Sequence, residues 1–203
     1  MRSARLKLLF FEFFFNYIIP MQTIKRILLG FSLVLITTLI SLTTEAKLSV
    51  MQVQLNWTYK NFPEKIKVYN VTPSKSAFIS ETATVETLGE APVTNEVQGP
   101  VEVKKGQSKT LVLVIENKSN KDIYFFAVPH EVHPAPASAG HFFECLCVGK
   151  VYKITPKSVW YRVVRININS SFQDIQNFDI EHQIVGLTEA EFKKSYEDRL
   201  YTQ

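Results

Sequence analysis

Two cysteines lie one residue apart in a segment rich in aromatic and apolar residues, 140–148, and the chain has no others. Alternate residues of a β-strand share a face, so Cys145 and Cys147 would point the same way from an extended segment, with Leu146 on the opposite side. Paired thiolates are soft ligands that select Cu(I), zinc or the iron of iron–sulfur clusters. Metal binding is therefore the first chemistry that these residues suggest.

The number of available ligands distinguishes among these metals. A closed structural zinc site takes four ligands in a tetrahedron, and two cysteines provide only half of them. Cu(I) is satisfied by two or three ligands, so the pair alone can hold it, or two pairs can share copper across a dimer. Ligand number therefore favours Cu(I) as the cofactor, with Cys145 and Cys147 as its ligands.

Histidines could extend this ligand set. His141 alternates in register with the two cysteines and is expected on their face, which makes it the candidate for an additional metal ligand. His130 and His133 lie beside prolines in a loop and are expected to face solvent. His182 lies in the polar C-terminal part of the chain and carries no special signal.

The first 46 residues resemble an export signal. Met21 begins a short basic stretch, and an apolar run of about 16 residues, 27–42, ends shortly before Ala46. A basic start, a core of this length and a small-residue exit are typical of a secretory signal peptide, whereas a membrane span needs about 20 residues. We therefore expect residues 1–46 to be an N-terminal extension plus a signal peptide cleaved after Ala46, with an uncleaved membrane anchor as the alternative. Met21 is the favoured start of translation and Met1 the alternative.

Export changes the expected chemistry of the cysteines, because oxidising compartments favour disulfides. Same-face neighbours on a strand have Cα atoms about 7 Å apart, at the upper limit for an unstrained bridge. A structural disulfide is therefore not expected, and a strained, redox-active one is the alternative. Copper binding needs thiolates, so a thiol reductase would have to keep the pair reduced. Cysteines that simply fill the core are the plainest alternative.

Charge and composition exclude some partners. The 203 residues carry a net charge of +4, with 46% hydrophobic and 21% charged residues, which is ordinary for one globular domain with an appended segment. Residues 1–46 hold five Lys or Arg against two Glu, and the remainder holds 18 basic and 17 acidic residues. Because the basic excess belongs to the N-terminus, nucleic acid is not an expected partner.

The rest of the chain is a series of short strands separated by turn signals. Apolar and polar residues alternate through 51–59 and 65–71, and β-branched residues dominate 110–116. Further strands are expected at residues 84–88, 101–103, 123–128, 141–152 and 160–168, with a loop at 129–140. About seven strands with no helix between them predict an all-β fold, an immunoglobulin-like antiparallel β-sandwich over residues 47–175.

Residues 176–203 are expected to form a C-terminal tail with a short helix. Thr188 precedes Glu191 by three residues, just ahead of Phe192, which is the spacing of a capping box. The helix should span residues 189–200 and pack on the sandwich rather than on a partner.

Catalysis has no signature in this sequence. No nucleophile–base arrangement or phosphate-binding loop is present, and the acidic residues are scattered, mostly at turns. The Cys-x-Cys spacing differs from the Cys-x-x-Cys of thiol–disulfide enzymes, and no thioredoxin-like βαβ pattern surrounds it, which disfavours that class. We expect that the chain is not an enzyme.

Between residues 100 and 168, the order of features resembles the periplasmic domain of the CtaG-type copper chaperones of cytochrome c oxidase assembly. The shared features are residues 101–106 ahead of a long strand, 116–119 in the turn after it, 127–129, and 138–143 leading into Cys145-Leu146-Cys147. Leu146 and Val148 stand where that family has two phenylalanines.

The resemblance implies an immunoglobulin-like domain in which Cys145 and Cys147 bind Cu(I). It also implies a homodimer formed through copper and delivery of the metal to the cytochrome c oxidase subunit that carries the catalytic copper. The expected location is the periplasm or another extracytoplasmic space, with anchoring to the inner membrane as an option.

Two functions from different classes follow. The leading hypothesis is an exported Cu(I)-binding chaperone, and the competing one is an immunoglobulin-like protein-interaction module with non-functional cysteines. Solvent access distinguishes them, because two sulfurs buried in the core with no opening would favour the interaction module.

Overall fold

The computed structural model describes residues 50–75, 77–172 and 175–200. All the described residues belong to one compact unit. The predicted N-terminal extension, with its signal peptide or anchor, lies outside the described residues. Among the helices of the described ranges, none combines the length and the apolar character that a membrane span requires.

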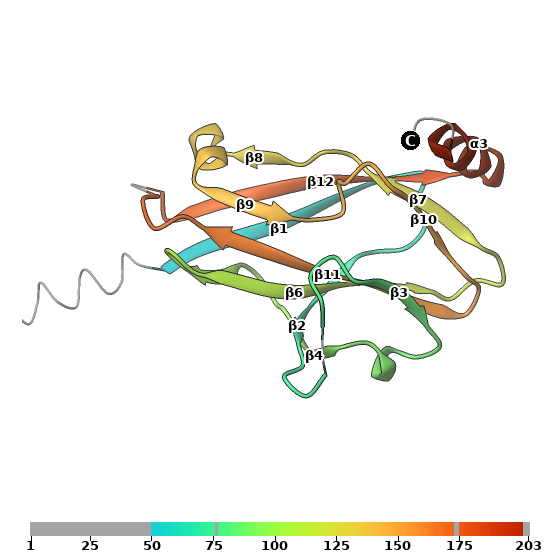
Figure 1. Cartoon of the computed structure of the whole chain (residues 1–203), viewed down its shortest axis with the longest axis horizontal. Coiled ribbons are helices and arrows are strands. Elements are labelled where there is room, and N and C mark those ends of the chain that lie inside the picture. Colours follow the sequence, from blue (N-terminus) through green and yellow to red (C-terminus); the bar gives the residue numbers. More distant parts are fainter. Residues whose placement is uncertain (1–49, 76, 173–174, 201–203) are drawn as a thin grey trace, which may run out of the picture. The chain divides into compact units, whose positions relative to one another are not determined.

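Two six-stranded sheets, here called sheet A and sheet B, make up residues 50–187 (Figure 1). Sheet A has the order β10-β7-β12-β1-β5, with β8 also beside β12, and comprises β1 (Val50–Lys60), β5 (Val101–Lys104), β7 (Ile123–Ala127), β8 (Glu131–His133), β10 (Val151–Ile154) and β12 (Asn177–Leu187). Sheet B has the order β3-β11-β6-β2-β4, with β9 also beside β11, and comprises β2 (Lys67–Val71), β3 (Thr82–Val85), β4 (Val93–Glu96), β6 (Ser108–Asn117), β9 (His141–Glu144) and β11 (Ser158–Ile168). The predicted all-β sandwich is confirmed.

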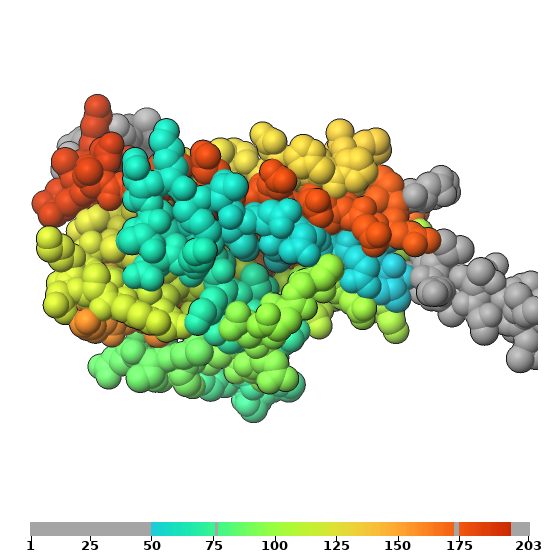
Figure 2. Space-filling view, turned by 180° about the vertical axis from the view of Figure 1, so that it is seen from behind, coloured from blue at the N-terminus to red at the C-terminus, as the bar shows by residue number. Residues whose placement is uncertain are grey.

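The first and the last described strands, β1 and β12, pair with each other in sheet A. β1 and β12 run parallel over nine paired positions, whereas the other strand pairs of the described ranges are antiparallel. Figure 2, which shows the opposite side of the molecule, has the blue residues of β1 next to the orange residues of β12. The sandwich therefore extends to Leu187, past the predicted boundary at residue 175, and the start of the expected tail is a central strand of sheet A.

Alternating residues explain how sheet A covers the core. In β1, Met51, Val53 and Leu55 are buried, while the intervening glutamines and asparagine are partly exposed. In β12, the buried side chains are likewise every second residue, Phe178, Ile180, His182 and Ile184. This period of two is the pattern of a strand with one buried face.

Sheet B is covered on both faces. Leu111 and Leu113 of β6 join the core between the sheets, while Val112 and Val114 join a second apolar cluster with Tyr161 on the outer face. Double burial explains why residues 111–115 form an uninterrupted apolar run rather than an alternating one.

The C-terminal helix lies where the capping box predicts it. α3 (Glu189–Leu200) follows Thr188, whose backbone N–H donates to Glu191 Oε2 at 2.7 Å, while the Glu191 N–H donates back to Thr188 Oγ1 at 3.3 Å. The ring of Phe192 packs on Tyr124 of β7, with 4.6 Å between ring centroids. The helix therefore packs on the sandwich, as expected.

Two other predictions for the middle of the chain are wrong. The expected loop 129–140 contains β8 and a short 3₁₀ helix, η2 (Ala135–Ala139). The expected single strand 141–152 is instead two strands, β9 in sheet B and β10 in sheet A, so the chain crosses between the sheets at residues 145–150.

Candidate metal centre

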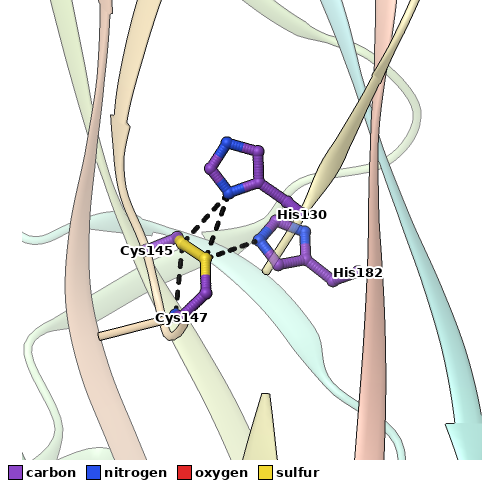
Figure 3. Close-up of side chains that lie close together, drawn as sticks. All are labelled: His130, Cys145, Cys147 and His182. Carbon is purple, nitrogen blue, oxygen red and sulfur yellow. Dashed lines mark hydrogen bonds between the residues drawn. A yellow bond between two sulfur atoms is a disulfide. The ribbon is translucent and has the colours of Figure 1, made fainter. Parts of the chain in front are cut away.

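Four side chains with metal-binding atoms converge between the two sheets. They are His130, Cys145, Cys147 and His182, and their ligand atoms all lie within 4.8 Å of one another (Figure 3). His182 comes from the middle of β12 in sheet A, His130 from the segment between β7 and β8, and the cysteines from the turn after β9. We call this set the His/Cys cluster.

Competition for one edge of β11 forces the cysteines out of their strand. β9 pairs with β11 only over Arg165–Ile168, because β3 occupies the same edge of β11 from Val159 to Arg162. Between these stretches, the Val163 N–H donates to Glu81 O and the Val163 carbonyl accepts from Ser80, each at 2.9 Å. β9 has no pairing partner beyond Glu144, so the chain turns towards sheet A there.

The turn brings the two sulfurs into a disulfide. Cys145 and Cys147 are bonded to each other, and their Cα atoms are 5.6 Å apart. The prediction that a disulfide is not expected is therefore wrong. It assumed the Cα spacing of an extended strand, whereas the turn shortens that spacing into the ordinary range for a bridge.

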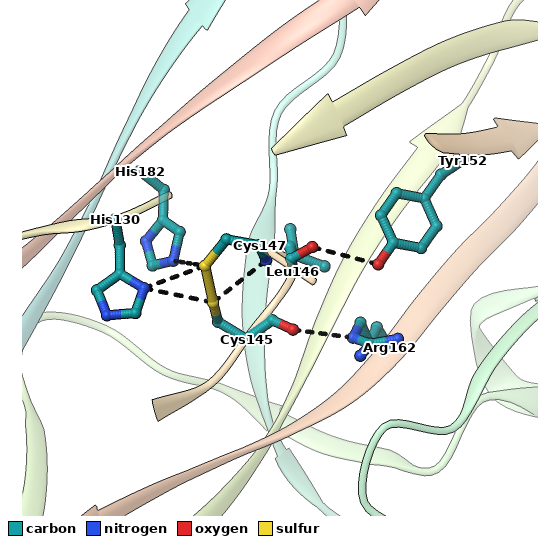
Figure 4. The surroundings of a disulfide bond; sticks show 7 residues. All are labelled: His130, Cys145, Leu146, Cys147, Tyr152, Arg162 and His182. Carbon is teal, nitrogen blue, oxygen red and sulfur yellow. Dashed lines mark hydrogen bonds between the residues drawn. A yellow bond between two sulfur atoms is a disulfide. The ribbon is translucent and has the colours of Figure 1, made fainter. Parts of the chain in front are cut away.

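Two side chains of the sandwich hold the carbonyls of this turn (Figure 4). Arg162 Nε donates to the carbonyl of Cys145 at 3.2 Å, and the Tyr152 hydroxyl donates to the carbonyl of Leu146 at 3.3 Å. The Leu146 side chain is completely buried in the core. Arg162 is 4% exposed and also donates to Thr82 Oγ1 at 2.7 Å, so it ties the turn to the neighbouring strand β3.

A β-bulge directs His130 into the sandwich. β7 and β8 follow each other along the same edge of β12: Ala127 pairs with Ile184, and Glu131 pairs with Glu181. Between them, the Val128 N–H donates to Gln183 O at 2.9 Å, so Pro129 and His130 together lie opposite His182. Proline has no N–H to donate to the neighbouring strand, which suits Pro129 to a bulge. The extra residue of a bulge shifts by one position the alternation of side chains between the two faces of the sheet.

The sequence predicted that His130 faces solvent from a loop, and the bulge explains why this prediction is wrong. Its Nδ1 lies 3.1 Å from Cys147 Sγ and 3.4 Å from Cys145 Sγ. The side chain is half-buried, and desolvation, followed by the charge of His141, lowers the pKa of His130. The neutral imidazole that results is the form that binds metals.

His182 is the most deeply placed member of the cluster. It is 1% exposed, stacks on Trp57 with 4.6 Å between ring centroids, and has its Nε2 3.9 Å from Cys147 Sγ. Its Nδ1 is buried with no hydrogen-bond partner. Burial, with a smaller contribution from His130, lowers the pKa of His182 to about 3, so the ring is neutral at physiological pH.

His141, the predicted additional ligand, is not part of the cluster. Its Nδ1 lies 2.9 Å from the carbonyl of Ala137, and its ring centroid is 6.2 Å from that of His130. The prediction assumed that β9 extends through Cys147, so that His141 and the cysteines share a face. The strand ends at Glu144, before either cysteine. His133 is exposed, as expected, with Nε2 3.7 Å from Glu131 Oε2.

The expectation that His182 carries no special signal is wrong, because its place in an alternating segment predicts burial. Phe178, Ile180, His182 and Ile184 alternate with polar residues, which is the pattern of a strand with one buried face. A histidine in phase with three apolar residues is expected to be buried. The pairing of His130 with His182 has no comparable signal, because it depends on a bulge between strands distant in the sequence.

The donor set fits a soft or borderline metal once the disulfide is reduced. Two thiolates and two neutral imidazoles are ligands for Cu(I) or zinc, whereas a disulfide sulfur is not a thiolate and binds neither metal well. Loading the cluster would therefore require two electrons, delivered to the bond between Cys145 and Cys147.

Comparison with known proteins places the chain in a family without an assigned role. No curated protein and no solved structure matches it. A family model described as a domain of unknown function, DUF8709, matches residues 51–187. This span begins in β1, ends with β12 and includes the whole His/Cys cluster, while α3 lies outside it. Because the match covers more than half of the sequence, the chain belongs to the DUF8709 family.

Proposed function

We propose that the chain is an exported Cu(I)-binding chaperone whose cargo is held by the reduced thiolates of Cys145 and Cys147. His130 and His182 complete the donor set. The observation that carries this proposal is the convergence of four donor atoms from three separate segments within 4.8 Å. The thiolates suit a soft cation, and the two histidines are neutral and need lose no proton to bind.

The burial of His182, with Nε2 facing Cys147 Sγ, supports a ligand role. A buried polar atom without a partner costs free energy, and such atoms in native proteins need a reason. A metal on Nε2, which lies 3.9 Å from Cys147 Sγ, would leave Nδ1 as the protonated nitrogen, still without a partner. Holding a ligand on Nε2 is a function that accounts for the cost of burying this polar ring.

The graded burial of the donors suits a carrier better than a store. Cys145 and His182 are buried, while Cys147 and His130 are partly exposed. A donor or recipient protein can therefore reach one thiolate and one imidazole without opening the sandwich. Two sulfurs buried with no opening would favour the competing interaction-module hypothesis, whereas the partial exposure of Cys147 favours copper binding.

The resemblance to CtaG-type chaperones extends the proposal to partners and location. The recipient is then the cytochrome c oxidase subunit that carries the catalytic copper, and two chains can share copper through their cysteines. The location is periplasmic or otherwise extracytoplasmic.

Zinc is the second candidate cargo, because the cluster supplies the four donors that zinc requires. The number of ligands favours Cu(I) when only the two cysteines are counted, and His130 and His182 raise that number to four. A structural zinc ion would be bound in all copies and would stabilise the fold strongly, whereas a transferred Cu(I) would exchange. Competition between the two metals separates these cases.

The test is anaerobic Cu(I) titration of the reduced chain against a chromophoric Cu(I) chelator. We expect about one Cu(I) per chain, and no binding by the variant that combines C145S and C147S. X-ray absorption of the loaded protein should report two sulfur and one or two nitrogen ligands. Stoichiometric binding by the double variant, or zinc that excess Cu(I) does not displace, would contradict the proposal.

A further inference from the structure

The two cysteines of the disulfide are not equally exposed. Cys145 is 4% exposed and belongs to the main core, whereas Cys147 is partly exposed and packs only against its margin. Exposure then rises along the chain, because Val148 is 50% exposed and Gly149 and Lys150 are also exposed. A side chain added at Gly149 would meet nothing within 4 Å, so solvent lies next to this half of the turn.

The buried half of the turn is held rigidly. The carbonyls of Cys145 and Leu146 accept hydrogen bonds from Arg162 and Tyr152, and the Leu146 side chain is anchored in the core. Cys145 is almost completely buried, so an incoming molecule has little access to its side chain. It can approach Cys147 from the solvent side of the turn.

We infer that a reductant opens this disulfide at Cys147, and that Cys145 is the leaving group. The reductant belongs to the chemical class of thiols, either a small thiol or a protein dithiol. The inference concerns the metal-free oxidised state and does not depend on which metal the reduced cluster binds.

The reaction proceeds in two thiol–disulfide exchanges. A thiolate of the reductant attacks Cys147 Sγ, a bond forms between these two sulfurs, the bond to Cys145 breaks, and its electron pair remains on Cys145 Sγ. A second reductant thiolate then attacks the reductant sulfur of the mixed disulfide and releases Cys147 as a thiolate. The reductant leaves as a disulfide, and the cysteine pair has gained two electrons.

A backbone hydrogen bond within the turn also stabilises negative charge on the leaving sulfur, Cys145 Sγ. The backbone N–H of Cys147 donates to Cys145 Sγ at 3.2 Å. A hydrogen bond to a sulfur strengthens as that sulfur becomes negative, so this N–H favours departure of Cys145. Cys147 Sγ has ring nitrogens as its neighbours instead, His130 Nδ1 at 3.1 Å and His182 Nε2 at 3.9 Å. The backbone hydrogen bond of the turn and the greater exposure of Cys147 therefore both favour Cys145 as the leaving group.

Trapping identifies the attacked sulfur. The oxidised full chain is mixed with glutathione, quenched in acid within the first part of the reaction, and fragmented by mass spectrometry between Cys145 and Cys147. We expect glutathione on Cys147 in at least about tenfold excess over Cys145, because access decides which sulfur reacts. Equal labelling, or more label on Cys145, would overturn the inference.

Single-cysteine variants provide a second measurement that is unaffected by exchange of the trapped group. The thiol of Cys147 in C145S should react with an aromatic disulfide reagent at least about tenfold faster than the thiol of Cys145 in C147S. In guanidinium chloride the two rates should become equal, which controls for intrinsic reactivity. Equal rates in the folded variants would contradict the inference, and the trapping result decides the case if one variant does not fold.

Discussion

The sandwich has two places where a strand edge is shared by two partners, and the His/Cys cluster lies between them. In sheet A, β7 and β8 share an edge of β12, and the interruption between them is a bulge that keeps the chain in the sheet. In sheet B, β3 and β9 share an edge of β11, and the chain leaves the sheet altogether after Glu144. The first interruption redirects one side chain, His130, and the second delivers two, Cys145 and Cys147.

The difference shows two ways in which an irregular edge can supply ligands. A bulge changes the direction of a side chain while the pairing on either side holds it firmly. A crossover turn instead depends on side-chain hydrogen bonds, here from Arg162 and Tyr152, to keep its backbone in place. His182 differs from both, because it occupies a regular position in β12 and is held by strand pairing and by packing against Trp57.

The largest expected effect concerns pH and tests the burial of His182. Its pKa is about 3 in the folded chain against an ordinary value of 6.5, so the unfolded chain binds more protons between these values. The stability of the metal-free oxidised chain should be constant above about pH 7 and fall as the pH drops towards 3, by an amount on the order of several kcal/mol. Urea unfolding across this range measures it.

The matched control is H182L, which should lose this component of the pH dependence. Carboxylates such as Glu116, whose pKa is lowered mainly by its hydrogen bond to Lys67, also contribute to acid unfolding, so the difference between the two chains is the quantity to compare. Identical pH profiles for both chains would show that His182 is solvated in the folded state.

The next effect tests what holds the crossover turn. R162M removes hydrogen bonds to the carbonyls of Cys145 and Ser80 and to Thr82 Oγ1 and should destabilise the oxidised chain by about 3 kcal/mol, because the acceptors lose buried donors. The matched variant R165M lies three residues further along β11 and breaks the ion pair of Arg165 with Glu144. Both of these side chains are partly exposed, so the free energy of unfolding should fall by less than about 1 kcal/mol. Equal losses in urea unfolding would show that the turn does not depend on Arg162.

A smaller effect, of opposite sign, tests the ligand role of His182. H182L replaces a buried imidazole that has an unpaired nitrogen with an apolar side chain, so at pH 7 the metal-free oxidised chain should become about 1 kcal/mol more stable. Cu(I) affinity of the reduced variant should fall at least about tenfold, or about 1.4 kcal/mol. Loss of stability with unchanged affinity would indicate a purely structural residue.

The smallest effect distinguishes His130, which directly precedes β8, from His133, the last residue of β8. H130A should weaken Cu(I) binding by about threefold, because a half-buried ligand contributes less than a buried one. H133A, three residues away and exposed, should leave Cu(I) affinity unchanged and stability within about 0.5 kcal/mol. Both are measured by chelator competition, and an equal loss in the two variants would contradict a specific role for the bulge.

Much of the fold was predictable because its determinants are local. The alternation in residues 51–59, the doubly buried run in 111–115 and the capping box at Thr188 all led to elements that the structure contains. The single strand expected across the cysteines failed for a non-local reason. Its continuation was excluded by β3, a strand about 60 residues earlier in the chain.

For the candidate site, the sequence by itself determined the donor types and the proximity of Cys145 to Cys147, because residues two apart cannot separate. Only the tertiary structure decided that they form a disulfide, since that required the chain to turn where the edge of β11 is occupied. It also decided that His130 and His182, rather than His141, face the sulfurs. A bulge opposite a central strand and a crossover between sheets are properties of strand pairing, and pairing is chosen by which edges remain free in the assembled sandwich.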